Sequence, residues 1–128
     1  MLATSVEIKA PAAAAWHLLT DTSRWPQWGP SVSSVESAER YIGPGSTGRL
    51  QTSFGVWLPF RVTEFVAGER WSWEVAGIPA TGHRVESLER DRCRVVFEVP
   101  LLAAPYLPVC RLAAERIRSI LEQEQHRL

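Results

Sequence analysis

The chain has 128 residues, of which 45% are hydrophobic and 22% are charged, and its formal net charge is zero. This size and composition are typical of one globular domain with a real hydrophobic core. Fourteen basic side chains are balanced by fourteen acidic ones, so the chain lacks the strong basic face of a nucleic-acid-binding protein, and we expect no nucleic acid partner.

The cysteines and the N-terminus indicate a cellular compartment. Cys93 and Cys110 are too few for a disulfide framework, and we expect both to be buried and reduced. Residues 1–9 are too short and too polar for a signal peptide. No apolar run approaches the ~20 residues that cross a bilayer. We therefore expect a cytoplasmic protein without membrane insertion.

The first third of the chain predicts one strand and two short helices. Apolar and polar residues alternate over 4–9, which indicates a half-buried strand. Pro11 then starts a helix over 12–19, because a proline at the first helical position loses only an N–H that would have no partner. Residues 20–23, Thr-Asp-Thr-Ser, offer caps for a second short helical turn. The prolines and the glycine of 25–30 end that turn.

The middle of the chain alternates with period two between turns, as strands of an antiparallel sheet do. The predicted strands cover residues 32–40, 49–54, 56–65, 71–75, 80–89 and 93–99. Turns are expected at 43–46, 67–70 and 89–92, and residues 100–108 form a proline-rich apolar connector.

From about residue 108 to the end, apolar residues recur at three- and four-residue steps, which predicts a long amphipathic helix. The stripe contains Val109, Leu112, Ala113, Ile117, Ile120, Leu121 and Glu124. Such a helix lays its stripe on one face of the sheet. The pattern therefore predicts a single α+β domain over 1–128. A curved antiparallel sheet of about six to seven strands wraps around the C-terminal helix and leaves a cavity unless large side chains fill it.

Several local sequences resemble those of a known superfamily. They are Ile8-Lys-Ala-Pro-Ala-Ala-Ala-Ala-Trp16, Leu19-Thr-Asp21, Trp25-Pro-Gln-Trp28, Pro59-Phe60-Arg-Val-Thr-Glu64 and the strand with Trp71 and Trp73. With the order of elements, they resemble the helix-grip fold of the START-like, Bet v 1-like (SRPBCC) superfamily and its polyketide cyclase/dehydrase-like group. The resemblance covers nearly the whole chain. It implies a pocket for a hydrophobic or aromatic small molecule, but the superfamily hosts carriers, cyclases, lyases and receptors, so it selects no reaction.

His83 is the residue on which an enzymatic interpretation depends. Alternation places it with Val85 on the cavity side of its strand, where a neutral imidazole can exchange a proton with a ligand carbonyl or phenol. The alternative is a core histidine bonded to its neighbours. The candidate ligand-binding residues are Trp25, Trp28, Phe60, Trp71, Trp73, His83, Val85, Phe97, Tyr106, Cys110, Ala113, Arg116 and Ile117.

Two roles stay open for the tryptophans. Trp25 and Trp28 flank a proline near the expected mouth, where they form either a lid over the ligand or a plug that packs the second helix onto the sheet. Trp71 and Trp73 face inward as core or as cavity wall. Arg116, beside the helix stripe, either reaches an anionic ligand group or stays in solvent.

Three functions agree with the sequence. The first is binding of a hydrophobic small molecule, which a large cavity without a polar cluster favours. The second is a cyclase or dehydratase for an aromatic polyketide-like substrate, which a hydrogen bond from His83 to a second polar group favours. The third is a protein-interaction module with a nearly filled pocket. No CxxC, HxxxH or glycine-rich phosphate loop occurs, so we expect no metal and no cofactor. We expect a monomer or a homodimer.

Overall fold

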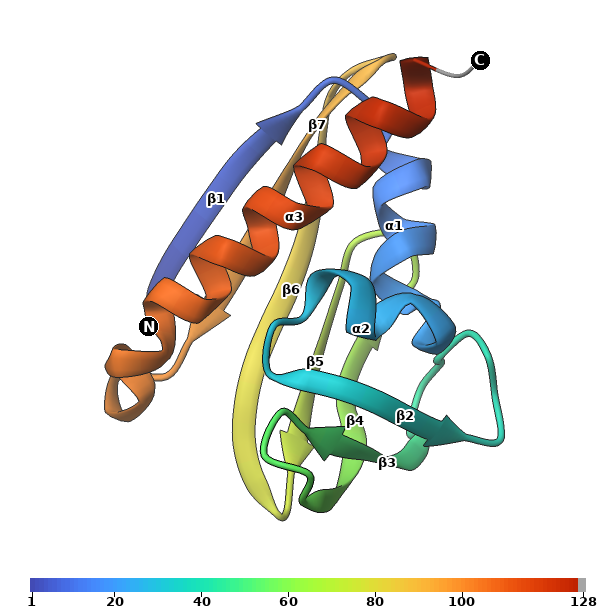
Figure 1. Ribbon diagram of the computed structural model, residues 1–128. Helices are drawn as coiled ribbons and strands as arrows, with labels where there is room; N and C mark the ends of the chain where they lie inside the picture. The colour runs from blue at the N-terminus through green and yellow to red at the C-terminus, as the bar shows by residue number, and fades with distance from the viewer. Residues whose placement is uncertain (127–128) are drawn as a thin grey trace.

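The computed structural model describes residues 1–126 as a curved sheet of seven antiparallel strands with a long helix packed on its inner face (Figure 1). In chain order the elements are β1 (Leu2–Ile8), α1 (Ala12–Thr20), the 3-10 helix η1 (Thr22–Arg24), α2 (Trp25–Trp28), β2 (Val32–Ser37), β3 (Thr47–Thr52), β4 (Trp57–Val66), β5 (Arg70–Val75), β6 (Ile78–Glu89), β7 (Arg92–Val99), the 3-10 helix η2 (Leu101–Tyr106) and α3 (Leu107–His126). The predicted α+β fold is confirmed, including the short helices after the first strand.

The order of strands in the sheet is β1-β7-β6-β5-β4-β3-β2. The first strand therefore pairs with the last, and all other pairs join strands that are consecutive in the sequence. The register places Trp71 opposite His83, and His83 opposite Phe97. Directly opposed residues share one face of a sheet, so these three side chains form a row across the inner face.

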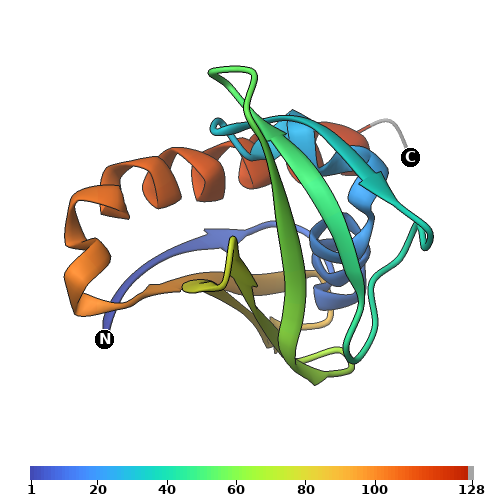
Figure 2. The same ribbon diagram turned by 90° about the horizontal axis from the view of Figure 1, so that it is seen from below.

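The ladder between β5 and β6 contains a bulge, at which two residues of β6, Ala80 and Thr81, face the single residue Trp73 of β5. Further register shifts lie between β4 and β5 and between β6 and β7. Bulges bend a strand and increase its twist. Figure 2 shows the result, with β3 and β4 running steeply across the direction of β1 and β7.

Helix α3 is held on the sheet by a stripe of buried residues. They are Cys110, Ala113, Ala114, Ile117 and Leu121. Their small and aliphatic side chains recur at the period of one helix face, and the two alanines allow the helix to lie close to the sheet. The predicted stripe was wrong at Leu112, which is 45% exposed, because the buried face is centred nearer to Ala114.

Some predicted boundaries also change. Strand β2 ends at Ser37 rather than at residue 40, and β6 begins at Ile78 rather than at residue 80. The predicted connector at 100–108 contains η2 and the first turn of α3. The helix predicted for residues 127–128 lies outside the described residues.

Candidate functional site

A stack of three aromatic rings from three elements lies on the inner face of the sheet, at its middle. Trp25 of α2 lies parallel to Trp71 of β5, with ring centroids 5.4 Å apart and 9° between the planes. Trp71 in turn stacks on His83 of β6, with centroids 3.9 Å apart. Trp73 and Phe97 meet the stack with their edges, an arrangement that aromatic quadrupoles favour. Much of the volume between sheet and helices is therefore occupied by aromatic side chains.

The two tryptophans of α2 are anchored to the end of α1. The indole N–H of Trp25 donates to the carbonyl of Leu19 at 2.9 Å, and that of Trp28 donates to the carbonyl of Leu18 at 3.2 Å. The last carbonyls of a helix have no partner within the helix, so each indole satisfies one of them. Trp25 is 2% exposed and Trp28 is 6% exposed. This burial favours the plug over the lid.

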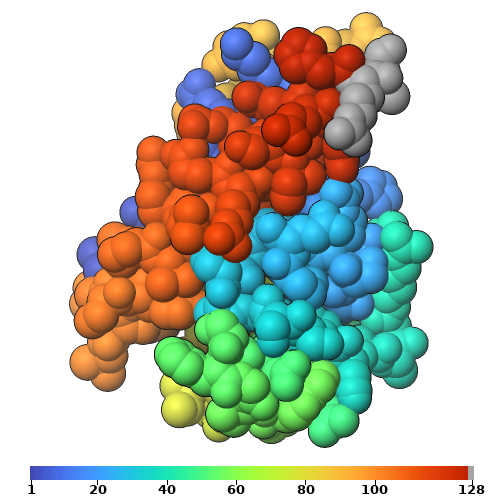
Figure 3. All heavy atoms as spheres, in the orientation of Figure 1, coloured from blue at the N-terminus to red at the C-terminus, as the bar shows by residue number. Residues whose placement is uncertain are grey.

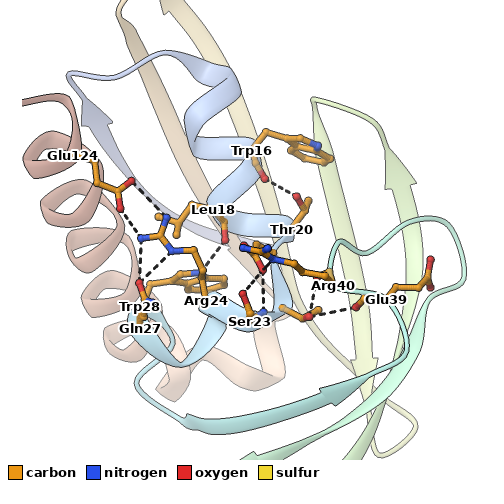
Figure 4. A network of polar contacts seen from close by, with 12 residues as sticks. Trp16, Leu18, Thr20, Ser23, Arg24, Gln27, Trp28, Glu39, Arg40 and Glu124 are labelled. Atoms are coloured by element: carbon orange, nitrogen blue, oxygen red, sulfur yellow. Dashed lines mark hydrogen bonds and ion pairs between the residues drawn. The ribbon is translucent and has the colours of Figure 1, made fainter. Parts of the chain in front are cut away.

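A network of polar side chains holds η1 and α2 in place (Figure 4). Arg24 bonds Glu124 of α3 at 2.6 Å and also the side-chain oxygen of Gln27. Asp21 caps η1 by accepting from the backbone N–H of Ser23, as the sequence predicted. Burial acts to raise the pKa of Asp21, but hydrogen bonds from Arg40 and Ser23 outweigh it and hold that pKa below its ordinary value. These contacts tie η1 and α2 to α3 and to the loop between β2 and β3.

His83 is at the centre of a hydrogen-bonded chain that the bulge in β6 makes possible. Its Nδ1 lies 3.3 Å from the carbonyl oxygen of Trp71, and its Nε2 lies 2.9 Å from Oγ1 of Thr81. The indole N–H of Trp73 donates to the same Oγ1 at 3.0 Å. Because a carbonyl only accepts, Nδ1 carries the ring hydrogen. Nε2 is then an acceptor, and the hydroxyl of Thr81 donates to it.

The imidazole of His83 is therefore neutral, with both nitrogens engaged. Burial lowers its pKa to about 3, and the hydrogen bond to the Trp71 carbonyl opposes this shift only partly. The ring is 2% exposed. At neutral pH it acts as a fixed dipole in the wall of the site.

A small hollow of about 40 Å³ lies above this chain. It is lined by Trp25, Trp28, Gly29, Pro30, Ser31, Val32, Trp73, Thr81, His83, Phe97, Tyr106, Val109, Cys110 and Ala113. One water needs roughly 10–15 Å³ of such space, so the hollow has room for a small polar group or a few waters, and not for the body of a larger molecule.

A wider apolar cleft of about 380 Å³ opens beside the hollow. It is lined by Ser31, Val32, Leu50, Thr52, Leu58, Trp73, Val75, Ile78, Pro79, Ala80, Thr81, Val99, Pro100, Ala103 and Tyr106. In Figure 3 a recess is visible between the orange residues of η2 and the green ones of the β3–β4 hairpin. Five residues line both spaces: Ser31, Val32, Trp73, Thr81 and Tyr106.

Among the residues that the structure describes, those lining the two spaces include no aspartate, glutamate, lysine or arginine, and His83 is neutral. Where hollow and cleft meet, the hydroxyls of Ser31 and Tyr106 are hydrogen-bonded to each other. Burial raises the pKa of Tyr106, against the lowering effect of the Ser31 hydrogen bond. The site is therefore apolar with a few polar groups at defined places, the usual design of a small-molecule pocket.

The candidate residues from the sequence fall into three groups. Those that line the hollow are Trp25, Trp28, Trp73, His83, Phe97, Tyr106, Cys110 and Ala113. Those that are buried behind it, without lining either space, are Phe60, Trp71, Val85 and Ile117. Arg116 is exposed on the far side of α3, next to Gln27 and Leu112, so the proposal that it reaches the cavity is corrected.

Two polar residues of the site were missed. Thr81 stands two residues before His83 on the same strand face, so alternation could have found it. Ser31 follows the Gly29-Pro30 break and pairs with Tyr106 across 75 residues of sequence, for which the sequence carries no local signal.

Two further properties concern residues 1–126, the part of the chain that the structure describes. That part of the chain holds no group of three or more histidine, cysteine, aspartate or glutamate side chains placed to bind a metal ion. None of its helices is both long enough and apolar enough to cross a membrane. Both cysteines in it are buried and free.

A curved antiparallel sheet that grips a C-terminal helix, with an apolar cleft at its open end, defines a helix-grip protein of the SRPBCC type. The chain belongs to the family described as polyketide cyclase / dehydrase and lipid transport, whose model matches residues 2–128. The resemblance found in the sequence is thereby confirmed. No curated protein matches the sequence.

Solved structures repeat the fold. The protein XoxI from Bacillus cereus superposes with a TM-score of 0.75 at 17% identity, over 98% of this chain and 97% of that one. Protein NE0264 from Nitrosomonas europaea gives a TM-score of 0.69 at 17% identity, over 98% and 96% of the two chains. The di-domain ARO/CYC StfQ from the steffimycin biosynthetic pathway gives 0.74 at 18% identity; 99% of this chain covers 46% of that one. At these identities the likeness concerns the fold alone.

Proposed function

We propose that the protein binds a hydrophobic small molecule whose body lies in the cleft between η2, β6 and the β3–β4 hairpin. The observation that carries the proposal is the cleft itself, about 380 Å³ of space lined almost entirely by apolar side chains. Pockets for small molecules commonly measure roughly 300–1,000 Å³. The family description, which includes lipid transport, agrees with this proposal.

The filled interior has a bearing on the third function that the sequence left open. The aromatic stack leaves a hollow of only about 40 Å³, as an interaction module with a filled pocket would have. The outer cleft, however, stays open next to it. Binding therefore needs no rearrangement of Trp25 or Trp71, and the ligand enters between Ala103 and Ile78.

A cyclase or dehydratase is the second candidate, and the hydrogen bond between His83 and Thr81 is the observation that favours it. Before His83 could take a proton from a ligand, Thr81 would have to release Nε2. A turnover assay with an aromatic polyketide mimic separates the two functions. Turnover by the wild type that is lost in His83→Gln, with binding retained, supports the enzyme; binding without turnover supports a carrier or sensor.

The binding proposal is tested with the neutral fluorophore N-phenyl-1-naphthylamine. We expect saturable fluorescence enhancement with the wild-type protein. Ala103→Trp, which fills the cleft, should abolish it. The matched control is Ala13→Trp, at an exposed alanine of α1 outside the cleft, and it should bind like the wild type. Equal binding by both variants would contradict the proposal. Mass spectrometry of unwashed protein under native conditions then identifies a co-purified ligand.

The two free, buried thiols suit a reducing compartment. We therefore also propose the cytoplasm as the location, which fractionation of cells that produce the tagged protein would test.

A further inference from the structure

The polar side chains around the inner hollow have almost all of their hydrogen-bonding capacity in use. The indole N–H groups of Trp25 and Trp28 are bonded to backbone carbonyls. The indole N–H of Trp73 is bonded to Thr81, and both nitrogens of His83 are bonded as well. Burial raises the pKa of the Cys110 thiol to about 11, so it stays uncharged. Among the lining side chains, a ligand at this end of the site can therefore use the weak S–H donor of Cys110 and what Thr81 and the Ser31–Tyr106 pair leave free.

The hydrogen bonds that link Thr81, His83 and the carbonyl of Trp71 all donate in the same direction, from Thr81 toward Trp71. The backbone carbonyl of Trp71 fixes this direction. The carbonyl of Trp71 cannot donate, so it keeps the ring hydrogen of His83 on Nδ1. If the hydrogen moved to Nε2, the lone pair of Nδ1 would face the lone pairs of that carbonyl. The hydroxyl hydrogen of Thr81 is thus committed to His83, because only that arrangement satisfies both nitrogens.

The hydrogen-bonding capacity that is still free at Thr81 follows from the hydrogen and lone pairs of its hydroxyl. A hydroxyl has one hydrogen and two lone pairs. The hydrogen goes to His83 and one lone pair receives the indole N–H of Trp73. One lone pair is left. Thr81 lines both the hollow and the cleft, so its side chain lies where the two spaces meet.

We propose that the site selects neutral ligands that carry a hydroxyl or N–H donor at their inner end, and that Oγ1 of Thr81 is the acceptor for this donor. This inference rests on the proposed function, since it concerns the ligand held in the cleft. It adds a chemical class, an apolar alcohol, phenol or amide, and it excludes carboxylates and ligands that present only a carbonyl or ether oxygen to Thr81.

Electrostatics supports the exclusion of anions. Among the residues that line hollow and cleft, none carries a positive charge at neutral pH, because His83 has a pKa of about 3. A buried carboxylate without a cation or several donors is strongly disfavoured. Farther out, the Ser31–Tyr106 pair keeps one hydroxyl hydrogen free, so a carbonyl group is tolerated at the mouth but not at Thr81.

The test is calorimetric titration with 2-naphthol, which has a donor, and with 2-methoxynaphthalene, which has only an acceptor. We expect Thr81→Val to lower the affinity for 2-naphthol about tenfold more than the affinity for 2-methoxynaphthalene. A tenfold change corresponds to the loss of one hydrogen bond. Thr81→Ser keeps the hydroxyl and should keep the wild-type ratio. Thr63→Val is the matched control, because Thr63 is an exposed threonine of β4 that lines neither space, and its ratio should also match the wild type.

A wild-type measurement makes the test independent of whether Thr81→Val folds. After correction for the partition of each probe between water and octanol, 2-naphthol should bind the wild type about tenfold better than 2-methoxynaphthalene. Charged 2-naphthoate should bind on the order of a hundredfold less well than 2-naphthol. If all three probes bind equally after correction, or if Thr81→Val weakens the first two probes alike, the inference is overturned while binding in the cleft stands. If no probe binds, the proposed function is wrong, and the inference, which depends on it, is overturned as well.

Discussion

Arg24 and Glu124 lie 100 residues apart in the sequence, and their side chains meet at 2.6 Å between Nη2 and Oε2. The pair joins the segment before α2 to the last turns of α3. Both side chains are partly exposed, 27% and 40%, so the pair contributes only about 0.5–1 kcal/mol to the stability of the fold. Its larger effect is positional, because α2 carries two of the tryptophans that line the hollow.

Arg24→Gln should therefore lower the free energy of unfolding by about 0.5–1 kcal/mol and increase acrylamide quenching of the buried tryptophans. Urea denaturation and quenching measure the two effects. Arg70→Gln is the control, because it breaks an ion pair with Glu64 on the outer surface of the sheet and should leave quenching as in the wild type. Equal quenching in both variants would argue against a positioning role for Arg24.

Acid should destabilise the protein through His83. Its pKa of about 3 in the folded protein lies below the ordinary 6.5. Between these two pH values, His83 is therefore protonated in the unfolded chain and neutral in the folded protein. Stability is then fully present above about pH 6.5 and falls with acid, by at most about 1.4 kcal/mol per pH unit. Urea midpoints from about pH 7 to about pH 4.5 should decrease accordingly, a range above that in which Asp21 titrates.

His83→Gln should flatten this pH dependence, although it lowers stability at pH 7. The exposed His17 gives the control, since His17→Gln should keep the wild-type profile. A wild-type urea midpoint that is constant over this range would show that folding does not lower the pKa of His83.

Position 48 requires a glycine, because neighbouring atoms lie where a Cβ atom would be. A Cβ added there would lie 2.6 Å from the carbonyl oxygen of Glu36 and 2.8 Å from Cζ of Phe60. Backbone cannot yield as a flexible side chain does, so Gly48→Ala should cost about 2–3 kcal/mol in thermal or urea unfolding. Gly43→Ala, where nothing lies within 4 Å, should change stability by less than about 0.5 kcal/mol. Similar costs for the two variants would mean that β2 and β3 are not packed as described.

Trp25 should contribute to stability as part of the core. Trp25→Phe removes an N–H that satisfies the Leu19 carbonyl and thins the stack against Trp71, so we expect a loss of about 2–3 kcal/mol. Trp57→Phe, at a half-buried tryptophan of β4 that packs under Arg49, should lose less than about 1 kcal/mol. A small effect of Trp25→Phe on stability with a large one on ligand affinity would restore the lid interpretation.

The fold could be predicted because its signals are local. Alternation over six or seven residues identifies a strand without knowledge of its partner, and a stripe at helical period identifies α3. The predicted phase of that stripe was wrong at one position, because Leu112 and Ala114 differ by about half a helical turn and the pattern favours burial of the larger apolar residue. In the structure the helix instead buries Ala114, because a small side chain lets the helix lie close to the sheet.

The candidate site was predictable only in part, for a related reason. His83 was found because it is a titratable residue on an inward strand face. Its chemistry depends on Thr81, on the carbonyl of Trp71 and on the bulge beside Trp73, and these are relations between strands. Arg116 was misplaced because a charged residue near an apolar stripe can turn either way, and desolvation favours solvent unless an anion is present to pair with it.

The pairing of β1 with β7, in which Leu2 lies opposite Val99, has a consequence for how the protein is made. Strand β1 is synthesised before β7 and has to wait for it before its backbone finds a partner. Until then Val6 and Ile8 are exposed on an edge that can pair with another nascent chain. Such non-local closure also slows folding. The yield of native protein should therefore depend on chaperones or on temperature during synthesis more strongly than the stability of the finished fold suggests.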